Sequence, residues 1–149
     1  VLESVRNYVN LGVKRITLAD TTGMATPKLV YERSKAVLEE FPDVTFTLHF
    51  HNTRGMGLAN VLEGIRAGIT HFDASLGGIG GCPFAPGASG NICTEDLVHM
   101  LHFMGYDMTV DLDRLIETSK YLQTLLSHPL DGQIVKAGKI TDLHSVETV

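Results

Sequence analysis

The chain has 149 residues, of which 44% are hydrophobic and 19% are charged, proportions that are typical of a soluble globular protein. No apolar run approaches the roughly 18 residues of a membrane span, and the formal net charge of -5, without a basic stripe, argues against nucleic acid as the main partner. The only cysteines, Cys82 and Cys93, cannot build a disulfide framework, so we expect a reducing interior rather than secretion.

Helical and strand-like stretches alternate in the first half of the chain, with loops rich in Gly, Thr, Asn and Pro between them. The patterns predict helices over 2–11, from 27 to about 41 and over 57–67, and strands over 14–19, 44–48 and 70–75. Thr26 and Pro27 form a typical helix start, and the strand over 44–48 is apolar enough to be buried on both faces. This alternation predicts a parallel α/β fold.

Two more helices are expected in the second half. The first is capped by Thr94, carries Glu95 and Asp96 in its first turn and ends at Gly105. The second runs from a cap at Asp111 to about residue 126. We therefore expect one domain over 1–128 and a polar tail over 129–149 that is irregular or partly disordered.

Every segment that carries candidate catalytic or binding residues follows a strand and precedes a helix: 20–23, 49–52 and 76–91. Parallel α/β folds gather their sites at this edge, whether the sheet is open or closed into a (β/α)₈ barrel. A complete barrel typically takes about 250 residues. About three βα units therefore predict only part of such a barrel.

His49 and His51 lie two residues apart at the end of an extended segment, so their imidazoles point to the same side and can grip one cation. A glycine-rich loop, 77–81, leads into Cys82, whose thiol would then act on whatever the cation holds. The alternatives are packed edge histidines and an inert, buried cysteine. The glycines do not fit a dinucleotide-binding fingerprint, because Pro83 stands where its third glycine belongs.

These residues carry a family resemblance. The sequence HFHN over 49–52, followed by ASLGGIGGCPFAPGASGN over 74–91, resembles the 3-hydroxy-3-methylglutaryl-CoA lyase family, a branch of the metal-dependent TIM-barrel lyases and synthases. The resemblance extends from about 18 to 98 and covers what would be the last strands of the barrel. Related condensing synthases share the histidine pair and the closing asparagine but lack the Gly-Gly-Cys-Pro loop, which makes that loop the discriminating motif.

The resemblance implies the C-terminal part of a (β/α)₈ TIM barrel in which His49, His51 and Asn91 bind Mg²⁺ or Mn²⁺ and Cys82 is the catalytic thiol. It implies metal-assisted cleavage of 3-hydroxy-3-methylglutaryl-CoA, or a close 3-hydroxyacyl-CoA analogue, to acetyl-CoA and acetoacetate or another oxo acid. Such an enzyme would serve leucine degradation and ketone body formation, in the cytoplasm or, in a eukaryote, the mitochondrial matrix. Imidazole and amide oxygen donors agree with a cation of intermediate hardness.

Several individual residues have a second interpretation. Asn91 caps the following helix or holds a left-handed turn if it is not a ligand. Asp20 either orients a metal ligand or substrate, or forms a turn. Glu95 matches an acidic position of the family but also suits the helix dipole. His99 and His102, at i and i+3, form either a surface metal pair or part of a solvated face, and Cys93 is a packing residue.

Phe50 and Asn52 stand at positions that vary in the family, so they bear on the substrate. The family's Arg-Asp pair near the start of the barrel has no counterpart here, so we expect this chain alone to be inactive. We expect a homo-oligomer, or pairing with a missing N-terminal half. The alternatives to a lyase are a non-catalytic half-barrel that acts as an assembly module, or a related acyl-CoA condensing synthase.

Overall fold

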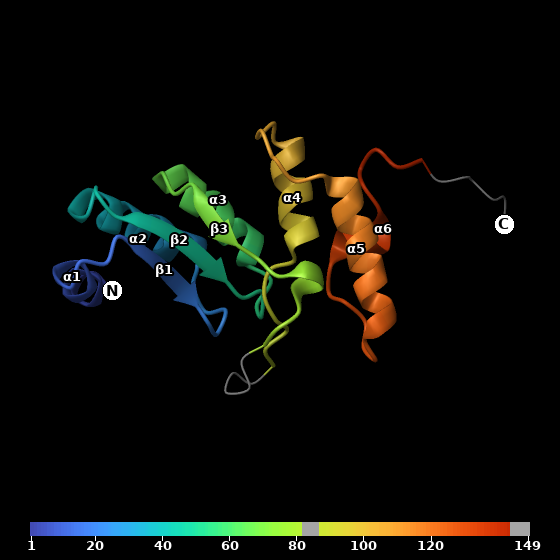
Figure 1. The fold of residues 1–149 in the computed structure, drawn as a ribbon, viewed down its shortest axis with the longest axis horizontal. Coiled ribbons are helices and arrows are strands. Elements are labelled where there is room, and N and C mark those ends of the chain that lie inside the picture. Colours follow the sequence, from blue (N-terminus) through green and yellow to red (C-terminus); the bar gives the residue numbers. More distant parts are fainter. Residues whose placement is uncertain (82–86, 144–149) are drawn as a thin grey trace.

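The computed structural model of the protein describes residues 1–81 and 87–143. Its centre is a three-stranded parallel sheet of β1 (Arg15–Asp20), β2 (Thr45–Phe50) and β3 (His71–Asp73), in the order β1-β2-β3 (Figure 1). Each strand is followed by a helical segment. The predicted parallel α/β organisation with three βα units is confirmed, although β3 is shorter than expected.

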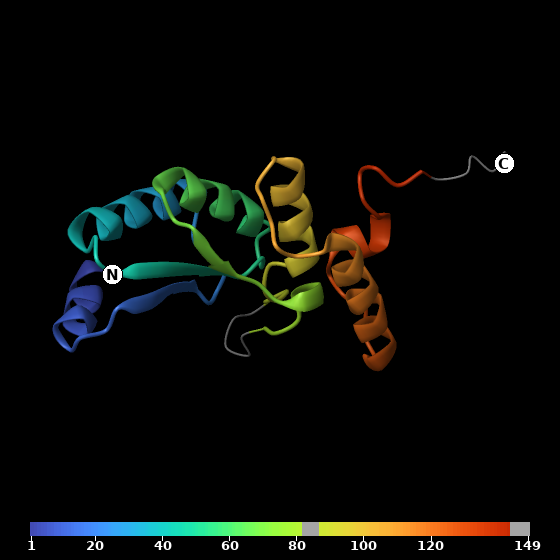
Figure 2. The same cartoon turned by 45° about the horizontal axis from the view of Figure 1, so that its top comes forward.

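Three helices precede or connect the strands: α1 (Leu2–Asn10), α2 (Pro27–Glu40) and α3 (Gly57–Ala67). Figure 2 shows α2 and α3 side by side over one face of the sheet. The Thr26 hydroxyl accepts a hydrogen bond from the Leu29 amide at 3.3 Å, as expected for a helix cap, and Gly68 ends α3 with a φ of 110°. The start of α2 and the end of α3 are thus set by local chemistry that the sequence shows.

Burial alternates along β2, so the expectation that this strand is buried on both faces is wrong for this chain. Phe46, Leu48 and Phe50 are buried, whereas Thr45, Thr47 and His49 are only partly buried. Successive strand residues point to opposite faces, and α2 and α3 cover one of them. The uncovered face carries the polar residues of β2, including His49.

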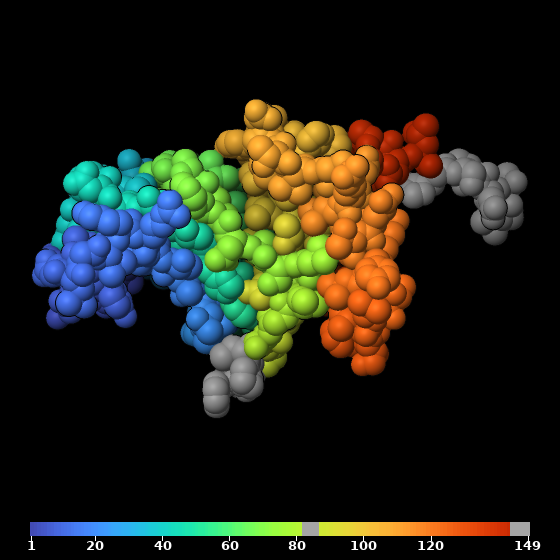
Figure 3. Space-filling view, viewed as in Figure 1, coloured from blue at the N-terminus to red at the C-terminus, as the bar shows by residue number. Residues whose placement is uncertain are grey.

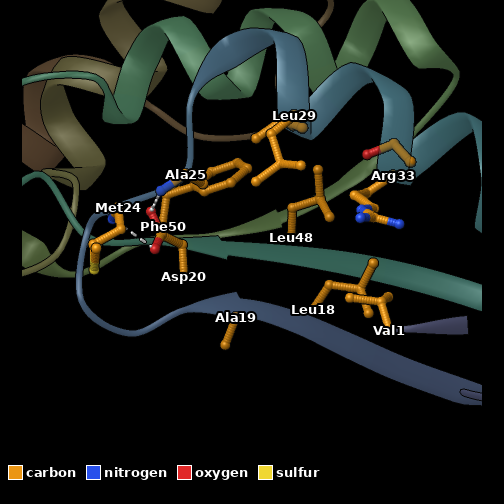
Figure 4. Close-up of a pocket in the computed structure, with 12 residues that line it drawn as sticks. Val1, Leu18, Ala19, Asp20, Met24, Ala25, Leu29, Arg33, Leu48 and Phe50 are labelled. Carbon is orange, nitrogen blue, oxygen red and sulfur yellow. Dashed lines mark hydrogen bonds between the residues drawn. The ribbon is translucent and has the colours of Figure 1, made fainter. Parts of the chain in front are cut away.

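The outer edges of the sheet are open within the described residues, because β1 and β3 each pair with β2 alone. Beside β1, an apolar groove of about 300 Å³ lies between the sheet and α2 (Figure 4). Leu18, Leu29 and Leu48 are among the residues that line it. An open apolar edge of this kind favours pairing with another segment.

The second half of the chain forms a short 3₁₀ helix, η1 (Leu76–Gly78), and three α-helices: α4 (Thr94–Phe103), α5 (Leu112–Leu125) and α6 (Gln133–Ala137). Figure 1 shows α4, α5 and α6 beyond the end of the sheet. Ile92 and Leu97 join the main hydrophobic core of the sheet, so both halves share one core. The Asp111 carboxylate caps α5 as expected, but Cys93, rather than Thr94, precedes the first turn of α4.

Residues 130–137 are more ordered than the sequence predicts. Leu130 is only 2% exposed, and residues 133–137 form α6. The amides of Gln133 and Ile134 donate to the Asp96 carboxylate on α4, at 3.0 and 2.8 Å. Because these partners lie 37 and 38 positions away in the sequence, the local pattern of the tail does not reveal them. Across the described residues, no helix combines the length and the apolar character that a membrane crossing requires.

Candidate metal-binding and catalytic site

The site lies at the carboxyl ends of the strands, where His49 occupies the uncovered face of β2. In the β2–β3 register His49 stands opposite Asp73, and its Nδ1 lies 2.5 Å from Asp73 Oδ1. A carboxylate at this distance favours a proton on Nδ1 and leaves Nε2 with a free lone pair. Sequence reasoning missed Asp73; its position in the register opposite His49 is the property that identifies it.

His51 follows the strand and is 8% exposed. Its ring lies 5.2 Å, centroid to centroid, from that of His49, and its backbone forms an antiparallel bridge with Asn91. Burial, followed by the nearby His49, lowers the pKa of His51, against a smaller opposing effect from Asp20. The neutral imidazole, which is the form that binds metals, is therefore favoured.

Asn91 is oriented by its own amide group. Its Nδ2 donates to the carbonyl oxygens of Ile79 and Gly80, at 2.9 and 3.2 Å. These two bonds fix which way the amide points. Because Cys93 precedes the first turn of α4, Asn91 does not cap that helix.

Two candidate ligand atoms are buried without a hydrogen-bond partner among the residues that the structure describes: His51 Nδ1 and Asn91 Oδ1. Buried polar atoms are normally paired, and these two belong to residues that adjoin through a backbone bridge, so one bound cation would give both a partner. In the same described ranges no three His, Cys, Asp or Glu side chains lie close enough together to hold a metal. The candidate set instead combines two histidines with the side-chain amide of Asn91. His49, His51 and Asn91 thus fit a divalent cation.

Asp20 forms a turn, which is one of the two roles that the sequence allowed for it. Its carboxylate accepts hydrogen bonds from the Met24 and Ala25 amides, at 2.9 and 3.0 Å (Figure 4). It stands opposite Phe50 in the β1–β2 register, on the face that the helices cover. Arg54 holds the same loop by donating to the carbonyl oxygens of Thr22 and Gly23, at 3.1 and 3.2 Å.

Phe50 and Asn52 have structural roles, contrary to the expectation that they bear on the substrate. Phe50 is 3% exposed and belongs to the core. The Asn52 side-chain oxygen accepts a hydrogen bond from the Gly57 amide at 3.1 Å, at the start of α3. Alternation along β2 places His49 and Phe50 on opposite faces.

Cys82 lies outside the described residues, so its predicted role stays a prediction. The described base of its loop is tightly packed: a Cβ at Gly78 would lie 2.7 Å from Cys93 Sγ, and one at Gly90 would collide with the Gly78 carbonyl oxygen. Both glycines have positive φ angles, of 73° and 113°. Only glycine combines this backbone conformation with such close approach.

Cys93 is buried, at 6% exposure, which confirms its packing role. Burial, followed by the charges of Asp96, Glu95 and Asp131, raises the pKa of its thiol to about 12. A thiol that stays protonated near neutral pH is a poor nucleophile.

Glu95 and His99 make contacts that the sequence did not predict. Glu95 is fully buried, and its Oε2 accepts a hydrogen bond from the Gly77 amide at 3.0 Å. His99 is partly buried, and its Nε2 accepts from the Ile140 amide at 3.2 Å. Because its Nε2 is occupied, His99 is poorly placed to form a surface metal pair with His102, which is exposed.

Comparison with known proteins identifies the family. The family model described as HMGL-like matches residues 1–122. The chain belongs to the HMGL-like family. It is 50% identical over 132 residues to the (R)-citramalyl-CoA lyase of Chloroflexus aurantiacus, covering 89% of this chain and 42% of that protein. It is 42% identical over 128 residues to the hydroxymethylglutaryl-CoA lyase YngG of Bacillus subtilis, covering 86% and 43% respectively.

A solved structure supports the same fold. An HMG-CoA lyase from Acinetobacter baumannii, in complex with coenzyme A and 3-methylmalate, matches with a TM-score of 0.92 and 55% identity, covering 97% of this chain and 48% of that one. The chain therefore spans less than half the length of the relatives that it matches. The predicted fold, part of the TIM barrel of this lyase family, is confirmed.

Proposed function

We propose that the protein containing this chain is a metal-dependent carbon–carbon lyase that cleaves a 3-hydroxy-3-methyl acyl-CoA thioester to acetyl-CoA and an oxo acid. The observation that carries this proposal is that His51 Nδ1 and Asn91 Oδ1 are both buried and unpaired in the described part of the chain, on two residues joined by a backbone bridge, with the His49 ring 5.2 Å from that of His51. Membership of the HMGL-like family supports the reaction class.

His49, His51 and Asn91 are the proposed holders of Mg²⁺ or Mn²⁺. Asp73 keeps a proton on His49 Nδ1, so that Nε2 is the donor atom, and burial keeps His51 neutral. When bound, a divalent cation at this place would polarise the tertiary hydroxyl of the substrate and acidify it. The hydroxyl proton is then lost to a base, the oxygen electrons form a carbonyl group and the adjacent carbon–carbon bond breaks.

The electron pair of the broken bond moves into a thioester enolate, which needs one proton to become acetyl-CoA. We assign this proton to the Cys82 thiol, acting as a general acid. The packed glycines at the described base of its loop support this role, because they bring both ends of the loop close together.

The substrate class is a 3-hydroxy-3-methyl acyl-CoA, represented by 3-hydroxy-3-methylglutaryl-CoA and its shorter analogue citramalyl-CoA. Relatives with either name match this chain, at 42% and 50% identity. Both compounds present the same tertiary hydroxyl on carbon 3, where the thioester carbonyl is carbon 1, and they differ by one methylene group. A single methylene is typically worth only about 1–3 kcal/mol of discrimination, so we propose activity on both, with acetyl-CoA as the common product.

The test is an assay of the full-length protein with each thioester in the presence of Mn²⁺, with acetyl-CoA release as the readout. We expect turnover of both thioesters, its loss on chelation of the metal, and a severe reduction in Cys82→Ser; turnover of only one would restrict the proposed substrate class to that compound. That variant should still bind Mn²⁺ and a substrate analogue. A Cys82→Ser protein that turns over at the wild-type rate would remove the thiol from the mechanism, and a metal-replete protein inert toward both thioesters would refute the lyase proposal.

The open strand edges favour one alternative, a half-barrel that serves as an assembly module. Within the described residues β1 and β3 each have one neighbour, and the groove beside β1 is apolar. The same observation fits a lyase whose remaining strands complete the barrel. The assay above separates the two, because an assembly module would bind no metal and release no acetyl-CoA.

A further inference from the structure

The residues after α5 hold the base of the glycine-rich loop. Leu130 is 2% exposed, and a Cβ at Gly77 would lie 2.6 Å from its Cδ2, so the two residues are in close contact. The Asp131 amide donates to the Gly77 carbonyl oxygen at 3.1 Å. Figure 3 shows the yellow-green residues of this loop region against the orange residues of the C-terminal part.

The other backbone group of Gly77 is held by Glu95. The Gly77 amide donates to Glu95 Oε2 at 3.0 Å, and Glu95 is fully buried. Its second oxygen, Oε1, faces Gly132, where an added Cβ would lie 2.6 Å away. Gly132 therefore leaves the space in which the Glu95 carboxylate sits. Its φ of -49° is an ordinary one, so this glycine is required for space rather than for backbone freedom.

Asp96, the next residue of α4, anchors the far end of the same segment. Its two oxygens accept from the Gln133 and Ile134 amides, at 3.0 and 2.8 Å. Residues 130–134 are thus tied to Gly77 at one end and to the first turn of α4 at the other. Hydrogen bonds that accept at a carboxylate are stronger than neutral ones, which suits a rigid support.

The base of the loop in turn orients Asn91. The Asn91 amide donates to the Gly78 carbonyl oxygen at 3.1 Å, and its Nδ2 donates to those of Ile79 and Gly80. These three acceptors directly follow Gly77 in the chain. A shift of Gly77 therefore moves the carbonyl groups that fix the direction of Asn91 Oδ1.

We propose that residues 130–134, acting through Glu95 and Gly77, form a positioning element that sets the Asn91 amide for metal binding. The element touches neither the metal nor the substrate. Its effect on the affinity for the metal rests on the proposed function, in which Asn91 is a metal ligand. Residues that only orient a metal ligand typically change metal affinity by about 10–100-fold when they are lost.

Gly132→Ala is the sharpest probe, since the methyl group displaces the Glu95 carboxylate without straining the backbone. In the full-length protein we expect Mn²⁺, titrated by electron paramagnetic resonance, to bind about tenfold more weakly, with turnover recovering at higher Mn²⁺. In a Glu95→Ala background the space is already open, so Gly132→Ala should cause no further loss. An unchanged Mn²⁺ dissociation constant in Gly132→Ala, or losses that simply add in the double variant, would overturn the proposal.

Leu130→Ala gives a second, independent test with a matched control. Leu125→Ala removes the same atoms from a side chain that is 64% exposed at the end of α5. We expect weaker Mn²⁺ binding in Leu130→Ala and none of this change in Leu125→Ala. Leu130→Met, which keeps most of the contact volume, should restore binding. An equal effect of the two alanine substitutions would assign the loss to general destabilisation and refute a positioning role.

Amide hydrogen exchange at Gly77 separates this proposal from the proposed function, since it needs no metal. The Gly77 amide should exchange faster in Gly132→Ala and in Leu130→Ala than in the wild type or in Leu125→Ala. Faster exchange in these two variants, together with a wild-type protein that binds no Mn²⁺, would refute the metal site while retaining the mechanical link. Unchanged exchange would refute the link itself.

Discussion

The sheet region and the C-terminal region obtain their contacts in different ways. In β1–β3 the register of neighbouring strands brings His49 opposite Asp73, so side chains of known strand position meet. In the region of α4–α6 the decisive bonds join backbone amides, of Gly77, Gln133 and Ile134, to the carboxylates of Glu95 and Asp96. The sheet places the candidate ligands His49 and His51, whereas the contacts of the C-terminal region hold the base of the loop that orients Asn91.

The largest effect is expected from the histidines of β2. In the full-length protein, His49→Ala and His51→Ala should each lower kcat/KM by more than about 100-fold, beyond the loss typical of a residue that only orients a ligand. Each removes a proposed metal donor. Titration with Mn²⁺ should show a loss of metal affinity of the same order of magnitude.

His102→Ala is the matched control, because His102 is exposed on α4 and away from the sheet. It should leave both the Mn²⁺ dissociation constant and turnover near the wild-type values. Undiminished turnover of His49→Ala or His51→Ala under saturating metal would be incompatible with the proposed ligand role.

The open sheet edge should dominate the behaviour of the isolated 149-residue chain. With β1 and β3 paired on one side only in the described residues, and an apolar groove beside β1, we expect self-association in sedimentation velocity and no tightly held metal. Leu29→Glu places a charge in the groove and should reduce the association. Leu125→Glu, on exposed α5, should not. A monomeric isolated chain with lyase activity would contradict this prediction.

Asp73→Asn tests the register contact with a smaller expected effect. The asparagine keeps the size of the side chain but no longer offers a charged acceptor to His49 Nδ1, so the ring loses its preferred tautomer. We expect about tenfold weaker Mn²⁺ binding, with an unchanged melting temperature. Asp43→Asn, at an exposed position before β2, is the control. Equal Mn²⁺ affinities in the two variants would mean that Asp73 does not orient His49.

The elements that sequence reasoning predicted well are those whose cause is local. Thr26 with Pro27, Gly68 and Asp111 mark helix ends through bonds or conformations within a few residues. The positions of His49 and His51 followed from the end of a strand. The fold class was predictable for this reason, whereas the association of Asn91 with the histidines came from the family resemblance.

What escaped prediction depends on contacts distant in the sequence. The order of residues 130–137 comes from Asp96, and the role of Glu95 comes from Gly77, 18 positions away. Asp73 lies in a short strand whose register with β2 only the sheet defines. The burial of Phe50 follows from the helices on one face of the sheet. None of these follows from the chain's periodicity.

The smallest effect concerns Cys93, whose reactivity reports on the packing between the two regions. Its folded pKa, about 12, lies above the ordinary value of 9.0. Between these values the unfolded thiol ionises first, so this group stabilises the fold fully below pH 9 and loses that contribution as pH rises toward 12.

At pH 8 we expect iodoacetamide to leave Cys93 unmodified in the folded protein and to modify it in denaturant, as mass spectrometry of the peptide that contains Cys93 would show. Gly78→Ala, whose methyl group would meet the Cys93 sulfur, should expose the thiol and speed its alkylation. Rapid alkylation of wild-type Cys93 at pH 8 would contradict the packing that joins the glycine-rich loop to α4.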